Sequence, residues 1–305
     1  MDYSEFKVDV KQCVSEKIRG RNAEVITREV VKANDMKRDS IFIMEEGSLT
    51  APTLYLNDFY EVYQNGGTIG EISDRIIEIH DYYSRSAPPQ FQDFEDFSKA
   101  KEHITCRLLN TAVNRRYLEE TPHLPFLDLS IVFYCTVTFC HEREVYSSKI
   151  TDRILTGWGK DVQDLYKIAL NNTSRLLGTY LKEVKEVFRE ILDQTGLEED
   201  PQIRTALDGE DRTPMFILSN RSRSYGAACI LDQDLMRRLS EKLKDDLYII
   251  PSSVHEVLLI PAHSGLSRQE ADEMVRNVNR SILEPADLLS DHVYLYSGKQ
   301  QRITC

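Results

Sequence analysis

The polar residues best suited to chemistry are grouped in the C-terminal third of the chain. A serine pair, a histidine and a glutamate occur in the run Ser252-Ser253-Val254-His255-Glu256. A histidine two residues from a serine is able to activate the hydroxyl as a nucleophile. If the run is a strand, Ser253 and His255 share one face and Glu256 lies on the other, because strand side chains alternate. The competing interpretation is that these groups only satisfy hydrogen bonds where a strand begins.

Cys229 is a second candidate nucleophile. It ends the run Tyr225-Gly226-Ala227-Ala228-Cys229, whose small residues predict a strand. Pairing of this strand with the one at His255 would bring thiol and imidazole together, and a neighbouring imidazolium lowers a thiol pKa. A hydrolase or thiol-dependent enzyme centred on Cys229, Ser253 and His255, with Ser252 and Glu256 nearby, is therefore one hypothesis.

Arg221 and Arg223 alternate with serines in a predicted hairpin tip. Guanidinium groups in such a loop are able to grip a carboxylate or a phosphate. A solvated loop without a ligand is the alternative.

Motifs for metals and cofactors are absent from the sequence. No C-x-x-C pair occurs, and Cys135 and Cys140 lie in an apolar run that favours burial. His141 and His255 are each followed by glutamate but lack a second histidine four residues on, which excludes the H-E-x-x-H arrangement. The glycines at 157 and 159 lack P-loop spacing, and no G-x-S-x-G occurs. We expect no metal and no cofactor.

Composition and charge narrow the class of partner. The chain has 305 residues, 41% hydrophobic and 29% charged, as expected for a folded protein. Lys and Arg total 38 against 50 Asp and Glu, so the net charge of -12 disfavours nucleic-acid binding. Acidic residues are concentrated in residues 51–100. That region is a solvated helical face, a docking face for a basic partner, or a mimic of nucleic-acid charge.

The sequence predicts a cytoplasmic location. Its first residues lack the charge and apolar run of a signal peptide. The most apolar segment, residues 127–140, is shorter than the roughly 20 residues that cross a bilayer, so we expect no membrane contact. The six cysteines are scattered through a long chain, which favours reduced thiols.

Hydrophobic periodicity predicts an α+β fold with mostly antiparallel strands in two subdomains. A polar run after Gly196 indicates a boundary, giving regions 1–200 and 201–305. The expected helices cover residues 4–18, 54–63, 68–83, 151–158, 162–172, 177–191 and 232–243, with capping boxes at 68–71 and 267–270. The expected strands cover residues 24–31, 40–44, 104–109, 127–139, 145–150, 215–218, 225–231, 248–250, 254–260 and 293–296.

Several segments together resemble a known family. They are residues 53–60, 218–221, 225–229, 247–257 and 289–296, which read TLYLNDFY, LSNR, YGAAC, LYIIPSSVHEV and LSDHVYLY. This set is similar to an uncharacterised bacterial family, a domain of unknown function found in accessory and mobile-element regions of gut anaerobes. The resemblance implies a cytoplasmic bacterial protein of about this length and brings no activity with it.

The leading functional hypothesis is a soluble cytoplasmic accessory module that binds another protein. It rests on the acidic charge, the absence of catalytic motifs and the resemblance. The enzyme centred on Cys229, Ser253 and His255 and the acidic nucleic-acid mimic are the two alternatives.

Overall fold

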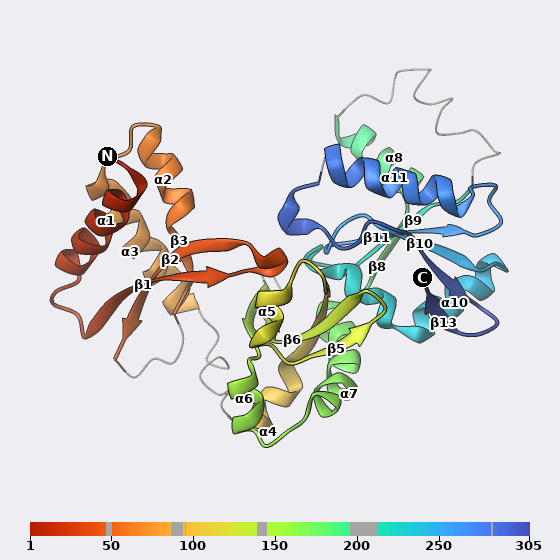
Figure 1. Ribbon diagram of the computed structural model, residues 1–305, viewed down its shortest axis with the longest axis horizontal. Coiled ribbons are helices and arrows are strands. Elements are labelled where there is room, and N and C mark those ends of the chain that lie inside the picture. Colours follow the sequence, from red (N-terminus) through yellow and green to blue (C-terminus); the bar gives the residue numbers. More distant parts are fainter. Residues whose placement is uncertain (47–50, 87–93, 95, 139–144, 196–212, 282) are drawn as a thin grey trace. The chain divides into compact units, whose positions relative to one another are not determined.

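The computed structural model describes residues 1–46, 51–86, 94, 96–138, 145–195, 213–281 and 283–305 (Figure 1). Helices and antiparallel strands follow one another irregularly along these residues, which confirms the predicted α+β class. The chain forms two compact units, Met1–Ala100 and Lys101–Cys305. Among the described residues, no helix combines the length and apolar character needed to cross a membrane.

The first unit is a three-stranded antiparallel sheet with its covering helices. Its elements are α1 (Tyr3–Lys17), β1 (Ala23–Val31), η1 (Ala33–Asp35), β2 (Lys37–Glu45), β3 (Leu54–Tyr55), α2 (Leu56–Gln64), α3 (Ile69–Ser86) and α4 (Phe97–Ala100). Phe6, Val10 and Val14 recur every fourth residue and are fully buried, so one face of α1 enters the core. β1 and β2 form the predicted hairpin. Thr68 and Glu71 exchange hydrogen bonds in the predicted capping box.

The second unit begins with a four-stranded sheet built on one long strand, β6. Its elements are η3 (Lys101–His103), β4 (Ile104–Asn110), α5 (Arg115–Glu119), β5 (His123–Phe126), β6 (Leu129–Thr138), β7 (Val145–Lys149), α6 (Asp152–Gly157), α7 (Val162–Asn172) and the π-helix η4 (Thr173–Leu177). β6 pairs antiparallel with β4 along one edge and with β5 and β7 along the other. Helix α7 packs against β4.

A six-stranded antiparallel sheet completes this unit, with strand order β13-β12-β10-β11-β9-β8. Its elements are β8 (Tyr180–Glu183), α8 (Val184–Thr195), β9 (Phe216–Ser219), η6 (Gly226–Leu231), α10 (Gln233–Leu243), β10 (Leu247–Pro251), β11 (Val257–Pro261), α11 (Arg268–Ser281), η7 (Pro285–Asp287), β12 (Tyr294–Ser297) and β13 (Arg302–Thr304). Helix α11 covers one face, where Ala271 and Val275 are buried with Ile250 (Figure 1). The predicted capping box at Ser267 and Glu270 is present.

The helix predicted over residues 177–191 is wrong in its first half. Gly178 has a φ of 63°, a left-handed conformation that ends the preceding helical turn. Tyr180–Glu183 then pair with β9 as β8, and α8 begins only at Val184. The apolar spacing thus runs across two elements, because a sheet partner from elsewhere in the chain determines the conformation of the first.

The strand predicted over residues 225–231 is also wrong. Tyr225 is left-handed with a φ of 52°, and the following residues form the 3₁₀-helix η6. A Cβ on Gly226 would lie 2.1 Å from Ser219 Oγ and 2.5 Å from the backbone nitrogen of Asn220. All of η6 is buried. The small residues of this run therefore permit close packing of a helix.

The compact units of the structure do not coincide with the predicted regions 1–200 and 201–305. The polar run at 196–212 lies outside the described residues. However, β8 before this run pairs with β9 after it, so both sides of the run contribute to one sheet. The compact units divide instead between Ala100 and Lys101. Strand pairing between distant segments, which composition does not show, is the reason for the difference.

Candidate functional site

His255 lies in the loop between β10 and β11, and not on a strand as predicted. Its Nδ1 accepts a hydrogen bond of 3.1 Å from the Tyr225 backbone N–H, and its Nε2 lies 3.2 Å from Asp287 Oδ1. Because Nδ1 accepts, the proton of the neutral ring resides on Nε2 and is donated to Asp287. Both ring nitrogens are thus engaged, and neither is hydrogen-bonded to a hydroxyl or thiol of the described residues.

The serines and the glutamate beside His255 organise the same loop. Ser253 is buried, and its Oγ accepts the His255 backbone N–H at 3.0 Å. Its own N–H donates to the Glu256 carbonyl. Ser252 and the Glu256 side chain are half-buried. A catalytic role for these residues stays a prediction, and the serine–imidazole hydrogen bond that it requires is not among the contacts of the described residues.

Cys229 lies within η6 and is buried. Burial raises the pKa of its thiol to about 12. The thiol is therefore protonated near neutral pH, whereas nucleophilic attack requires the thiolate. This environment is the opposite of the one expected for a reactive cysteine.

Arg221 and Arg223 contact neighbouring residues of the second unit. The Arg223 guanidinium lies 4.1 Å from the ring centroid of Tyr180. Arg221 packs so closely on Gly178 that a Cβ there would lie 2.7 Å from Arg221 Nε. Both arginines remain exposed. Their proposed role in gripping an anion stays a prediction, and the observed contacts explain why a glycine follows η4.

Several of the residues singled out in the sequence contact one another around Tyr225, which directly precedes η6. The Tyr225 backbone N–H donates a hydrogen bond to His255 Nδ1. The Ser219 hydroxyl donates to the His255 carbonyl at 2.7 Å. The N–H of Ala227 donates to the carbonyl of Val254, which secures η6 to the same loop. The loop and η6 therefore fix the backbone from which the Tyr225 ring projects.

The ring of Tyr225 forms one side of a stack around Arg107. The Arg107 guanidinium carbon lies 4.0 Å from the Tyr225 centroid and 3.7 Å from the Tyr134 centroid. Its Nη2 donates to Ser147 Oγ at 2.5 Å. No carboxylate of the described residues pairs with Arg107. Stacking holds a guanidinium by its faces and leaves its edge N–H groups for hydrogen bonds.

Strand register gathers polar side chains on one face of the four-stranded sheet. Directly paired residues point to the same face, and β6 and β7 pair Thr136 with Ser147. Arg107 on β4 pairs with Val132 and therefore shares this face. The face carries Arg107, Val132, Tyr134, Thr136, Ser147 and Lys149. The alternate residues of β6 (Phe133, Cys135 and Val137) are apolar and point the other way.

A second cation lies near this stack. Lys149 Nζ is 4.3 Å from the ring centroid of Tyr117, whose hydroxyl is hydrogen-bonded to that of Tyr134. Burial lowers the pKa of Lys149, although Glu120 and Asp152 act in the opposite direction. Burial also raises the pKa of Tyr225, while the charge of Arg107 lowers it.

Arg107 opens onto a cavity of about 220 Å³. Its lining residues are Arg107, Thr136, Val145, Ser147, Leu177, Ser224 and Tyr225. These provide one positive charge and several hydroxyl groups, and no carboxylate. Asp287, whose charge raises the pKa of Tyr225, is hydrogen-bonded to His255. Such a lining is suited to a small anionic group, because guanidinium and hydroxyl groups both donate hydrogen bonds to its oxygens.

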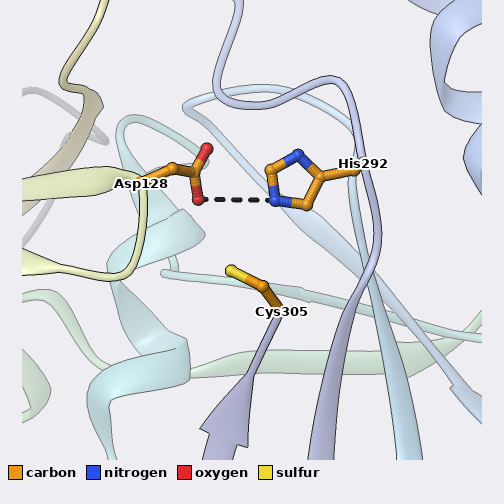
Figure 2. A group of neighbouring side chains, drawn as sticks. All are labelled: Asp128, His292 and Cys305. Atoms are coloured by element: carbon orange, nitrogen blue, oxygen red, sulfur yellow. Dashed lines mark ion pairs between the residues drawn. The ribbon is translucent and has the colours of Figure 1, made fainter.

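Donors for a metal ion come together at a different place in the second unit. Among the described residues, Asp128, His292 and Cys305 have donor atoms that lie within 4.8 Å of one another (Figure 2). Cys135, which the sequence analysis considered together with Cys140, is a poorer metal ligand. Burial raises the pKa of its thiol to about 12, so the thiolate that binds a metal is disfavoured. Cys140, His141 and Glu142 lie outside the described residues.

Arg107 and Tyr134 are not among the candidate residues that the sequence indicates. One local signal was available, because polar and apolar residues alternate along β6 from Phe133 to Thr138. That alternation indicates a two-sided strand with a polar face. No local signal links Tyr134 to Tyr225, since these residues are 91 positions apart in the sequence and meet only in the tertiary structure.

The fold and the site define an α+β protein with a polar cavity around a stacked arginine. The chain matches the model of a family of unknown function, DUF5688, over residues 3–298. It therefore belongs to that family, which confirms the predicted resemblance to an uncharacterised family. No match was found among curated proteins or among solved structures.

Proposed function

We propose that this protein acts by binding, and that its cavity at Arg107 receives a carboxylate or phosphate group. One observation carries the proposal: the guanidinium is held between two tyrosine rings and has no carboxylate partner among the described residues. The planar fork of arginine recognises both anions through paired hydrogen bonds. Thr136 and Ser224 also line the cavity and add hydroxyl-bearing residues to it.

The contacts favour binding over the hydrolase or thiol-dependent alternative. His255 bonds the Tyr225 backbone and Asp287, and the Cys229 thiol is buried. A nucleophile and a base within hydrogen-bond reach are the minimum for that alternative. The observed contacts instead support a role for His255 in positioning Tyr225, which lines the cavity.

The acidic region, residues 51–100, supports the nucleic-acid mimic less well than it supports a protein-binding module. Among the described residues, four of its carboxylates form ion pairs with basic side chains of the same unit. These pairs are Arg38–Asp58, Lys17–Asp74, Arg75–Glu78 and Arg21–Asp81. Paired carboxylates offer less net negative charge to a basic partner than a row of free ones.

We propose another protein as the source of the anion, as the sequence predicts. A cavity of about 220 Å³ has room for one side chain or a small head group. The net charge of -12 continues to disfavour nucleic acid. The cytoplasmic location and the bacterial accessory context remain predictions from the sequence and its resemblance.

The proposal is tested by calorimetric titration with inorganic phosphate, citrate and peptides that contain glutamate or phosphoserine. We expect the wild-type chain to bind at least one of these probes, and Arg107→Met to weaken that binding by about tenfold or more, because a charge-assisted contact is lost. Arg280→Met is the matched control, since Arg280 is exposed on α11. Equal affinities for wild type and Arg107→Met would contradict the proposal, as would no binding of any probe.

A further inference from the structure

A second site is formed by residues that are far apart in the sequence. Asp128 lies in the turn before β6, His292 precedes β12 and Cys305 follows β13. All three belong to the second unit. Figure 2 shows the carboxylate, the imidazole and the sulfur directed toward one another, and one donor atom from each lies within 4.8 Å of the others.

Neighbouring side chains orient the imidazole of His292. Its Nδ1 lies 3.1 Å from Asp291 Oδ1 and 3.3 Å from Ser290 Oγ. A carboxylate only accepts hydrogen bonds, so the shorter contact with Asp291 favours the neutral tautomer that carries its proton on Nδ1. The lone pair of Nε2 then faces Asp128 Oδ1 at 3.5 Å. This is the outer-shell arrangement that commonly orients a histidine ligand toward a metal ion.

The carboxylate of Asp128 is held in a similar way. Tyr294 donates its hydroxyl to Oδ1 at 2.8 Å, and Ser290 donates to Oδ2 at 3.3 Å. The hydroxyl of Ser290 thus connects His292 to Asp128. Both ligand side chains are fixed by groups that do not themselves enter the site, which reduces the ordering cost of binding an ion.

In this tautomer Nε2 and the Asp128 oxygen are both acceptors, and a cation bound by both satisfies their lone pairs. An imidazole lone pair, a carboxylate oxygen and a sulfur are the donor types that bind zinc, whereas magnesium and calcium prefer oxygen alone. Tetrahedral zinc with bonds of about 2.0–2.3 Å separates its ligand atoms by roughly 3.3–3.8 Å. The Nε2–Oδ1 separation of 3.5 Å already falls in this range.

We propose that Asp128, His292 and Cys305 bind a divalent transition-metal ion of the zinc type. Each residue supplies one ligand atom, and the bound Cys305 is a thiolate whose proton passes to solvent. Because Cys305 is exposed, water has access to the fourth position, as in sites with three protein ligands. The proposal is independent of the anion cavity at Arg107.

The first experiment titrates the chelator-treated full chain with Zn²⁺ and, for spectroscopy, with Co²⁺. We expect one ion bound at this site and a near-ultraviolet thiolate-to-cobalt band. Cys305→Ser is expected to abolish the band, and His292→Gln to weaken binding by at least about tenfold. Cys13→Ser, in the first unit, is the matched control and should bind as the wild type does. Equal Zn²⁺ affinity in the wild type and both site variants would overturn the proposal.

A second measurement does not depend on the variants folding well. Zn²⁺ is expected to slow alkylation of Cys305 by iodoacetamide in the wild-type chain, while alkylation of Cys13 serves as the internal reference. Mg²⁺ at the same concentration should give no protection. If Cys305 reacts at the same rate with and without Zn²⁺, the cation between His292 and Asp128 is a proton and the proposal fails.

Discussion

The backbone N–H of Tyr225 donates a hydrogen bond of 3.1 Å to Nδ1 of His255. The contact joins η6 to the loop between β10 and β11, and the two ring centroids lie 5.3 Å apart. Because the Tyr225 ring stacks on the Arg107 guanidinium, His255 influences the cavity through a residue that it positions.

Replacement of His255 tests this positioning role. His255→Ala leaves the Tyr225 N–H and the Asp287 carboxylate without their partner, so we expect the free energy of unfolding to fall by about 1–2 kcal/mol. Ser252→Ala is the control, because the Ser252 hydroxyl makes no hydrogen bond to the described residues, and it should change stability by less than about 0.5 kcal/mol. Chemical denaturation measures both. A His255→Ala chain as stable as the wild type would contradict the role.

Gly226 is expected to tolerate no side chain. A Cβ there meets Ser219 Oγ at 2.1 Å and the His255 carbonyl oxygen at 2.7 Å. Gly226→Ala should therefore destabilise the chain by about 1–3 kcal/mol or more, since buried backbone must shift. Gly157→Ala provides the comparison, because a Cβ at the end of α6 has no neighbour within 4 Å. Thermal unfolding of the two variants should give clearly different midpoints, and equal midpoints would count against the packing described for η6.

The buried thiols are expected to be unreactive in the folded chain. Burial raises the pKa of Cys106 to about 11 and those of Cys135 and Cys229 to about 12. Iodoacetamide at pH 8 should modify Cys305, which is exposed, and leave these three intact until denaturant is added. Peptide mass spectrometry distinguishes the sites. Rapid modification of Cys229 in the folded chain would restore the thiol-dependent enzyme as a candidate.

His263 should make stability depend on pH. Its hydrogen bond to Asp245, together with the carboxylate charge, raises its pKa above the usual 6.5. The folded state therefore favours the protonated ring, and the stabilisation is complete below about pH 6.5 and lost as pH rises through the folded-state pKa. Thermal unfolding should separate wild type from His263→Gln more at pH 6 than at pH 9. His123→Gln is the control. If the midpoints of wild type and His263→Gln differ by the same amount at both pH values, the prediction is wrong, because the contact with Asp245 would then not depend on the charge of the ring.

Local features of the fold were predictable from the sequence because they depend on residues close together in the chain. The capping boxes at Thr68 and Ser267 need only a partner three residues away. The hairpin of β1 and β2 needs only a short turn. The helix predicted over residues 177–191 was wrong in its first half because β8 forms by pairing with β9. The paired residues of these two strands are more than thirty positions apart in the sequence.

The sequence by itself determined the α+β class, the family and local features such as the capping boxes at Thr68 and Ser267. Only the tertiary structure decided which polar groups meet. It gives the His255 imidazole Tyr225 and Asp287 as hydrogen-bond partners. It also places Arg107 between two rings and brings Cys305 to Asp128. The physical reason is that hydrogen bonds, stacking and metal ligation act over a few ångströms in space, whereas sequence patterns report contacts only between near neighbours in the chain.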